Sequence, residues 1–427
     1  MREPILPFLT LHLLLPFALP AAQEGAAVLP ARATPGLDQL VRRAALRERV
    51  PGEDFQRSLP HEQWLAAQHG IVVPEGGDAP LAPYMLLADG GTPGQDTWAC
   101  LQPAHVAVTH DHLVLLDPDT LALDAADARA LLALAQASFD ERGLTLVAPT
   151  PLRWYISGAA LGELVGAAPL RAIGRSIDIW LPQDRATGAR SRFWMRLQNE
   201  IQMAWYEQPV NEAREQRRQL PVNSVWLHGQ GRLAMPGPPG DPPAGQPTGQ
   251  PAGQPARQQS APPLRRAFAT LYSDACATRG LGLATQADVA PLPPTFAALL
   301  EAIEALTTTA QTGTAAPRPS ALPILIDIGG LAQPFVSQDW GDWLARLAEI
   351  DAHWFAPAFH ALQAGRLARL HLTLGSDTGT VTLTVTRGDL KKFWRRRTLL
   401  SLLAGAPDAC APDSPTHNSP TPSKTHS

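Results

Sequence analysis

Short apolar runs alternate with amphipathic stretches along most of this chain. Residues 10–15 (TLHLLL) and 322–328 (LPILIDI) are continuous apolar runs, which is typical of strands buried on both faces. Residues 123–143 instead place apolar side chains at helical spacing, with Asp124 as the N-cap and Gly143 as the terminator. Strands that alternate with helices in this way predict an α/β fold.

Two pairs of strands joined by short turns add antiparallel pairing to this picture. Residues 367–374 and 380–386 flank a Gly-Ser-Asp-Thr-Gly turn, and residues 106–108 and 112–116 flank a second turn. Because hairpins occur beside strands connected by helices, the predicted fold class is a mixed sheet flanked by helices.

Three further stretches are predicted to be helical. They are residues 37–49, which have a basic outer face, residues 265–272 and residues 390–403. In the last of these, Phe393 and Trp394 are expected to continue the apolar stripe towards the leucines that follow, while the neighbouring Lys and Arg side chains form the solvated face.

Residues 192–233 form the most strongly patterned stretch. Trp194, Leu197, Ile201 and Trp205 recur at helical spacing, and Pro209 then breaks the helix. The interpretation continues with a second, charged helix at about 210–219, a buried strand at 223–227 and a Gly-rich turn at 228–231.

Composition divides the chain into one folded part and two low-complexity segments. Residues 236–263 repeat Gly-Gln-Pro and residues 405–427 are rich in Pro, Ser, Thr and His, so neither can bury enough apolar surface to fold. The hypothesis is a single α/β body over residues 8–404, with a disordered insertion at 236–263 and a disordered tail at 405–427.

The N-terminus has two interpretations. The apolar run after Arg2 resembles a short signal peptide, but Glu3, three prolines and a poor cleavage site favour the first strand of the sheet. A cytoplasmic protein is therefore expected, and the alternative is export if residues 1–22 are a signal peptide. Elsewhere no uninterrupted apolar run reaches eighteen residues, so no membrane partner is expected.

Charge and cysteine spacing exclude several classes of function. A net charge of -4 and a single basic turn at residues 391–397 argue against nucleic-acid binding. Cys100, Cys276 and Cys410 are too far apart for a metal or disulfide framework. His110 and His112 flank Asp111 in a turn with no third ligand in view, so no metal and no cofactor is expected.

Four side chains are the candidate ligand site: Asn211, Arg214, Asn223 and His228. Arg214 follows Asn211 by three residues, so both can face one side of a short helix, and Arg214 would anchor an anion. Helix termination and turn hydrogen bonding explain the same residues equally well. Asn223 and His228 are roughly 16 Å apart along one strand, so Asn211, Arg214 and Asn223 are preferred if only three converge.

These motifs carry a family resemblance. The run EIQMAWYEQPVNEAREQRRQLPVNSVWLHGQG resembles the bacterial RpfE-type regulatory proteins, which are phosphoglycerate-mutase-like. The resemblance extends more weakly over residues 8–404 outside the insertion. The matching positions are Asn199, Glu200, Gln202, Met203, Pro209, Val210, Asn211, Arg214, Asn223, Ser224, Trp226, Leu227, Gly229 and Gly231.

The same run is more distantly similar to archaeal-type, cofactor-independent phosphoglycerate mutases of the alkaline-phosphatase superfamily. Those enzymes hold two divalent metals with Asp and His side chains, and one of their Ser side chains becomes phosphorylated. A pair of metals held in this way stabilises both the attacking and the leaving oxygen of a phosphoryl transfer. Here Pro16 and Phe17 stand where the first metal-binding motif would follow the first strand. Asp327 and Asp377 could each be a single metal ligand, but a strand-end Asp and a turn Asp explain them more simply.

The resemblance therefore implies that this chain shares the architecture of these enzymes but lacks their metal-dependent chemistry. The expected function is a regulatory protein that binds a small phosphorylated or anionic ligand, with any protein partner unknown. The alternative is an active phosphoglycerate mutase or phosphatase acting on a small phosphorylated acid.

Overall fold

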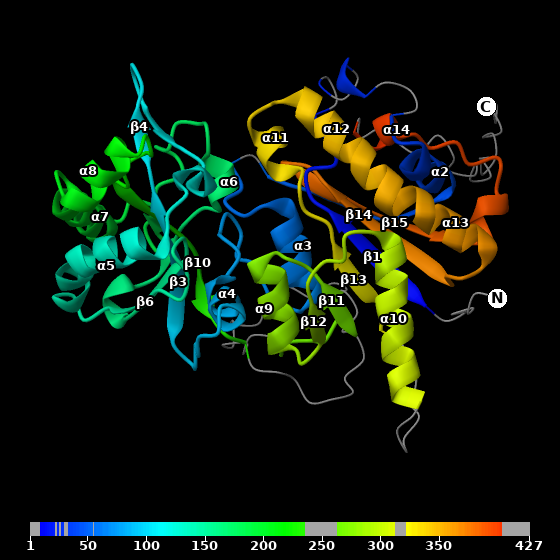
Figure 1. Ribbon diagram of the computed structural model, residues 1–427, viewed down its shortest axis with the longest axis horizontal. Coiled ribbons are helices and arrows are strands. Elements are labelled where there is room, and N and C mark those ends of the chain that lie inside the picture. The colour runs from blue at the N-terminus through cyan, green and yellow to red at the C-terminus, as the bar shows by residue number, and fades with distance from the viewer. Residues whose placement is uncertain are drawn as a thin grey trace, which may run out of the picture.

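The computed structural model describes residues 9–21, 24, 27–29, 33–53, 55–234, 263–311 and 322–403. They form two lobes, each built on its own sheet (Figure 1). Apart from Pro263, the predicted insertion at 236–263 and the predicted tail at 405–427 lie outside the described residues, so their disorder stays a prediction.

The larger sheet has seven strands in the order β12-β11-β13-β1-β14-β15-β2. The central strand β1 pairs in parallel with β13 and β14, and β11 and β12 extend the parallel part, whereas β15 and β2 add antiparallel pairs. The predicted mixed α/β sheet is thereby confirmed. The strands are β1 (Thr10–Leu15), β2 (Ala45–Pro51), β11 (Thr270–Tyr272), β12 (Asp288–Ala290), β13 (Ile324–Asp327), β14 (Arg369–Gly375) and β15 (Gly379–Thr386).

Helices cover both faces of this sheet because successive side chains of a strand point to opposite sides. Leu11, Leu13 and Leu15 pack into one core with α2, α10, α12 and α13, whereas Leu14 packs with α3, α4 and α9. These helices are α2 (Pro35–Arg43), α3 (Pro60–Gln68), α4 (Ala82–Ala88), α9 (Cys276–Ala284), α10 (Phe296–Gln311), α12 (Trp340–Ile350) and α13 (Ala356–Ala364).

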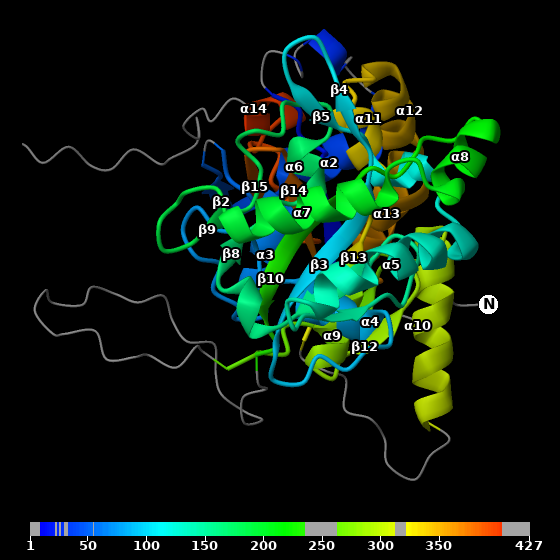
Figure 2. The same ribbon diagram turned by 90° about the vertical axis from the view of Figure 1, so that its left-hand side faces the viewer.

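The smaller sheet is entirely antiparallel, with the order β10-β3-β7-β6. Figure 2 shows α5 and α7 lying over it, with α8 to one side. The side chains between the sheet and these helices form a separate apolar core that includes Trp154, Trp194 and Trp205. The elements are β3 (Thr97–Ala104), β6 (Thr145–Val147), β7 (Trp154–Ser157), β10 (Ser224–Arg232), α5 (Ala125–Asp140), α7 (Arg192–Trp205) and α8 (Pro209–Gln216).

Smaller elements complete the fold. The predicted hairpin with His110 at its turn is confirmed as β4 (Val106–Val108) and β5 (Leu113–Leu115), which project from the smaller lobe (Figure 1). The remaining elements are β8 (Leu164–Val165), β9 (Gln183–Asp184), α6 (Pro169–Ala172), α11 (Ala332–Val336), α14 (Leu399–Leu403), the π-helical turn η3 (Asp351–Phe355) and the short 3-10 turns η1 (Pro118–Leu121), η2 (Ala159–Leu161) and η4 (Asp389–Lys391).

A third apolar core joins the two lobes. It contains Leu14 and Leu325 of the larger sheet together with Cys100 and Tyr155 of the smaller one, and α4 and α9 lie within it. The two helices approach closely at Gly280, where a Cβ atom would lie 1.9 Å from the carbonyl oxygen of Tyr84. The lobes therefore share this apolar core, and the single body over residues 8–404 stays a prediction.

One predicted helix is wrong in its second half and another is wrong throughout. The helix predicted at 37–49 ends at Arg43, and the residues from Ala45 to Pro51 form β2. The helix predicted at 265–272 is replaced by a loop that leads into β11. In both places pairing with a neighbouring strand overrides the local spacing of apolar residues.

The continuous helix predicted at 390–403 is also wrong, because only residues 399–403 form an α-helix, α14. Between η4 and α14 the chain is a loop, in which Phe393 is 71% exposed and Trp394 is 58% exposed. Arg43 explains the loop, because its guanidinium group donates hydrogen bonds to the carbonyl oxygens of Lys392 and Arg395. A helix would have used these carbonyls along its own axis, and its apolar stripe is not formed.

Candidate functional site

The strongly patterned stretch folds largely as predicted. Ser191 caps α7 by accepting a hydrogen bond from the amide of Trp194, and Pro209 opens α8 at a position where its missing N–H has no helical partner. The predicted Gly-rich turn at 228–231 is wrong, however. These residues belong to β10, which continues to Arg232 through an irregular register between His228 and Gly231.

The two candidate asparagines hold backbone segments together. The amide of Asn211 donates to the carbonyl oxygens of Trp205 and Val222, both at 3.0 Å, and accepts from the Val222 N–H at 2.8 Å. Asn223 makes a matching pair of hydrogen bonds with both backbone groups of Val106. Side-chain amides therefore fasten α7, α8 and β4 around the start of β10.

Arg214 is fully buried and all three nitrogen atoms of its guanidinium group are engaged inside the protein. Nη1 lies 2.9 Å from Oδ2 of Asp127 on α5, Nε donates to the carbonyl oxygen of Leu220, and Nη2 donates to that of Leu121. Arg217 also contacts Asp127, at 2.6 Å. Arg214 thus links α8 to α5 and to the loop before β10.

His228 lies apart from the other three candidates, further along β10. Burial lowers the pKa of its imidazole to about 4, so the ring is neutral at physiological pH. Its Nε2 atom has no hydrogen-bond partner among the described residues. The next residue, Gly229, donates its N–H to the carboxylate of Asp78.

One cavity brings two of the four candidates together. It has a volume of about 460 Å³ and its walls include Asn211 and Asn223, but not Arg214 or His228. Glu207, Glu212 and Glu215 also line it, and three carboxylates favour a cation over an anion. The ligand role of the four residues stays a prediction. The internal hydrogen bonds of Asn211, Arg214 and Asn223 define what these three side chains do in the fold.

A second candidate region is the carboxyl end of the parallel strands, where open α/β sheets commonly bind ligands. Phe17, just after β1, is 2% exposed and has a left-handed backbone with φ of 58°. Its ring lies 5.2 Å from that of Phe335 and 5.5 Å from that of His61. Trp343 donates its indole N–H to the Phe17 carbonyl at 2.9 Å. Aromatic packing thus fills the end of the central strand.

The carboxylate at the end of β13 is also engaged internally. Asp327 accepts hydrogen bonds from the hydroxyl groups of Ser273, at 2.9 Å, and Thr278, at 2.6 Å. Burial raises the pKa of Asp327 although these two hydrogen bonds oppose the shift. Asp377 lies in the turn between β14 and β15, with its carboxylate 4.0 Å from the guanidinium group of Arg175.

The boundary between the lobes contains four ionisable side chains that the sequence did not reveal, three of them buried and Glu62 half-buried. We call Arg57, Glu62, Asp78 and Arg171 the junction cluster. Burial, together with the proximity of Asp78, raises the pKa of Glu62 to about 8, and burial raises that of Asp78 to about 7. These four residues come from unlike segments and share no spacing. One local signal is that Glu62 lies where a Glu side chain caps a helix start.

The arginines of the junction cluster bind backbone across the boundary. Arg57 donates to the carbonyl oxygens of Ile179 and Trp180 at 2.8 and 3.1 Å. Arg171 donates to those of Gln56 and Asp377, both at 2.6 Å, and lies 5.6 Å from the centre of the Trp180 ring. The two guanidinium groups place positive charge at the boundary and fix the lobes relative to each other.

Comparison with known proteins gives fold-level likeness only. A scan against protein-family models matches no family, and a search of curated proteins finds no match. One similar solved structure is the cofactor-independent phosphoglycerate mutase from Thermoplasma acidophilum, with 13% identity, 93% of this chain and 95% of that chain covered, and a TM-score of 0.37. Another is a protein from Pyrococcus horikoshii, with 10% identity, coverages of 91% and 90%, and a TM-score of 0.42. At these values neither neighbour informs the activity of this chain.

Two findings concern metals and membranes. Within the described ranges, three or more His, Cys, Asp or Glu side chains are nowhere grouped so that they could hold a metal ion. None of the helices in the described part of the chain combines the length and apolar character needed to cross a membrane.

Proposed function

We propose that this chain is a regulatory, ligand-binding protein on a phosphoglycerate-mutase-like fold, and that it does not carry out metal-dependent phosphoryl transfer. The observation that supports this most is Phe17. Its buried ring and its bonded carbonyl group occupy the carboxyl end of the central strand. A metal centre at that position would need exposed oxygen or nitrogen ligands instead.

Asp327 gives independent support. Its carboxylate already accepts two hydroxyl hydrogen bonds, and burial raises its pKa. Both hydroxyl groups donate to the same carboxylate oxygen, Oδ2, so that atom is already engaged inside the protein. Asp327, the strand-end carboxylate that could have been a metal ligand, instead holds Ser273 and Thr278 in place.

The proposed ligand is a small phosphorylated acid, bound near the positive charge of the junction cluster. Burial and the nearby positive charge of Arg175 both lower the pKa of Arg171, so the two guanidinium groups lie close to each other. Arg175 is exposed beside Asp377. A guanidinium group that water can reach is well suited to bind phosphate through paired hydrogen bonds. The residues of the acidic cavity are less suited, because their carboxylates repel such a ligand.

A paired experiment tests catalysis. The full-length protein, supplied with Mn²⁺, Mg²⁺ or Zn²⁺, is assayed for phosphoglycerate mutase and phosphatase activity, and its metal content is measured. We expect no metal-dependent turnover. Turnover that Asp327→Asn abolishes and Asp288→Asn preserves would contradict the proposal, because Asp288 is an exposed acid of the same sheet on β12, two strands away from β13.

Binding is tested separately by calorimetry with 3-phosphoglycerate. We expect binding without turnover, and an affinity about tenfold weaker for Arg175→Ala, as removal of one charge-assisted contact predicts. Arg190→Ala is the matched control, because the side chain of Arg190 is 46% exposed and that of Arg175 is 49% exposed. Equal affinities for the two variants would exclude the junction as the ligand site.

A further inference from the structure

The loop between η4 and α14 combines exposed aromatic rings with a high density of positive charge. Residues 391–397, here called the basic aromatic loop, begin at the last residue of η4 and contain five Lys or Arg side chains and the pair Phe393 and Trp394. The two rings are 71% and 58% exposed, and their centroids lie 5.4 Å apart at an angle of 81°. Adjacent aromatic side chains in water are a feature of interaction surfaces.

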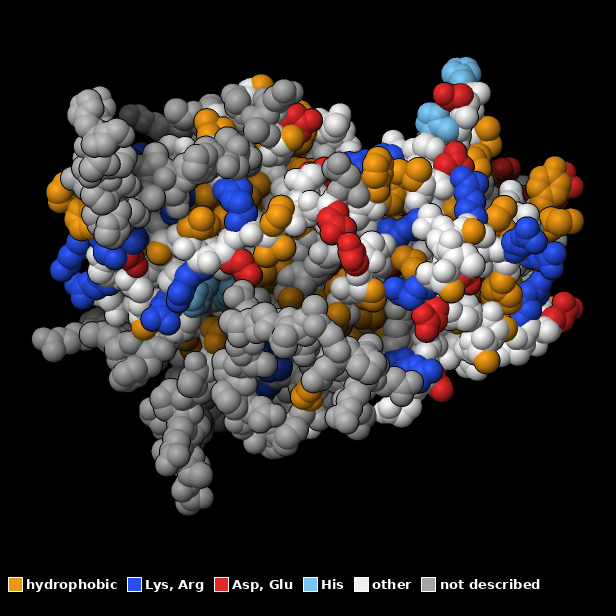
Figure 3. Space-filling view, turned by 180° about the vertical axis from the view of Figure 1, so that it is seen from behind, with side chains coloured by type: hydrophobic (Ala, Val, Ile, Leu, Met, Phe, Trp, Pro, Cys, Tyr) orange, Lys and Arg blue, Asp and Glu red, His pale blue; other side chains and the backbone are white. Residues whose placement is uncertain are grey.

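The positive charge extends beyond the loop. Arg42 at the end of α2 and Arg49 on β2 are exposed, and Arg49 donates a hydrogen bond to the carbonyl oxygen of Leu402 on α14. Seen from behind, Lys and Arg side chains gather beside hydrophobic ones at the end of the molecule that carries α2 and α14 (Figure 3). Within the described residues, the side chains of Lys391 and Arg396 have no hydrogen-bond or ion-pair partner.

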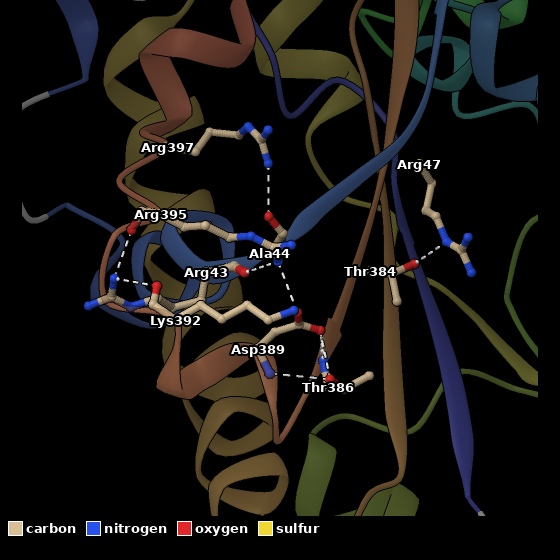
Figure 4. A network of polar contacts seen from close by, with 9 residues as sticks. All are labelled: Arg43, Ala44, Arg47, Thr384, Thr386, Asp389, Lys392, Arg395 and Arg397. Carbon is tan, nitrogen blue, oxygen red and sulfur yellow. Dashed lines mark hydrogen bonds and ion pairs between the residues drawn. The ribbon is translucent and has the colours of Figure 1, made fainter. Parts of the chain in front are cut away.

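The body of the protein fixes the shape of this loop. Arg43 donates to two loop carbonyls, at 3.1 and 2.7 Å, while Arg395 and Arg397 donate to the carbonyl oxygens of Arg43 and Ala44 (Figure 4). Asp389 accepts from Lys392 at 2.7 Å and from Arg395 at 2.9 Å. A loop fixed in this way presents its rings without an ordering cost on binding.

We propose that the basic aromatic loop docks the protein onto bilayers that contain anionic phospholipid. Phe393 and Trp394 enter the headgroup region, and the surrounding cations contact lipid phosphates. Trp favours the membrane–water interface, and Lys and Arg near an anionic leaflet are attracted to it. The expectation of no membrane partner rested on the lack of a spanning segment, which docking at the surface does not need.

The ring geometry favours a lipid surface over single-stranded nucleic acid. Bases stack on aromatic faces that lie open and roughly parallel to one another. The near-perpendicular arrangement of Phe393 and Trp394 directs the edge of one ring at the face of the other, which leaves no continuous platform for successive bases. Insertion into a headgroup region requires only exposed apolar area beside positive charge.

Co-sedimentation of the full-length protein with vesicles tests the proposal. We expect binding to vesicles of phosphatidylcholine mixed with phosphatidylserine, and little binding to phosphatidylcholine alone. The double variant Phe393→Ala/Trp394→Ala should bind about tenfold more weakly or worse, because apolar burial at the interface is lost. Phe55→Ala is the matched control, since Phe55 is also 71% exposed but lies elsewhere.

A second variant tests the electrostatic part. Lys391→Gln/Arg396→Gln should weaken vesicle binding and make it less sensitive to salt, because screening acts on exposed charges. Thermal melting confirms that each variant is folded. Absence of binding to the anionic vesicles, or unchanged binding by the aromatic variant, would overturn the proposal. So would tight binding of a labelled single-stranded oligonucleotide that depends on Phe393 and Trp394 while vesicles are not bound.

Discussion

At the scale of single residues, the chemical type of a side chain does not tell whether it binds a ligand or stabilises the fold through contacts inside the protein. Arg214 has the planar, charged side chain that anion sites use, yet every nitrogen atom of its guanidinium group contacts Asp127 or a backbone carbonyl. Sequence spacing correctly placed Arg214 and Asn211 on the same helix. It could not show that α5 supplies a buried carboxylate, because Asp127 is 87 residues away.

Removal of the Arg214 side chain tests this structural role. Arg214→Ala should lower the free energy of unfolding by about 3 kcal/mol, near the lower limit for a broken buried ion pair, because Arg217 still contacts Asp127. Urea denaturation measures the change. Arg196→Ala, an exposed arginine on α7, should change the stability by less than about 0.5 kcal/mol. Equal effects of the two variants would show that the buried contacts of Arg214 do not stabilise the fold.

At the scale of helices and strands, continuous or strongly periodic segments were predicted correctly. β1 and β13 are mostly apolar, and α5 has both an N-cap and a terminating Gly143. β2 was missed because its residues alternate Arg and Glu beside apolar ones, and its partner β15 lies more than 300 residues later. The loop at residues 391–397 was missed because the hydrogen bonds from Arg43 that shape it come from α2.

The crossing of α4 and α9 depends on one glycine, and its substitution gives a sharp prediction. Gly280→Ala places a Cβ atom 1.9 Å from the backbone oxygen of Tyr84, so the helices must separate. We expect a loss of about 1 to 3 kcal/mol in unfolding free energy. Thermal or urea unfolding measures this loss.

Substitution of Gly341, on another helix, should change the stability in the opposite direction. It lies near the start of α12, and a Cβ atom there would meet only Asp339 Oδ1, at 3.5 Å. Gly341→Ala should therefore stabilise the protein by up to about 1 kcal/mol through helix propensity. Destabilisation by Gly341→Ala equal to that by Gly280→Ala would mean that the close crossing is not the cause.

At the scale of the whole molecule, the two parts of the chain on either side of residues 236–263 are interleaved. The larger sheet takes β1 and β2 from the first part and β11 to β15 from the second, and β1 lies between β13 and β14. The core shared by the lobes likewise draws on both parts. Neither part can complete this sheet alone.

Limited proteolysis tests this interleaving. The composition of residues 236–263 predicts that proteases cut there first. Because the strands are interleaved, the two fragments should co-elute on size-exclusion chromatography under native conditions and separate only in denaturant. Separation of the nicked fragments in native buffer would contradict the sheet order.

The central position of β1 also determines when this protein can fold during its synthesis. His12 on β1 bonds to Thr373 on β14, 361 residues later in the chain. Translation at about 5 to 20 residues per second delays that partner by roughly 20 to 70 seconds. The apolar first strand therefore leaves the ribosome long before the strands that bury it. Until then it is exposed to other nascent chains, and chaperone cover over this interval would protect it from aggregation.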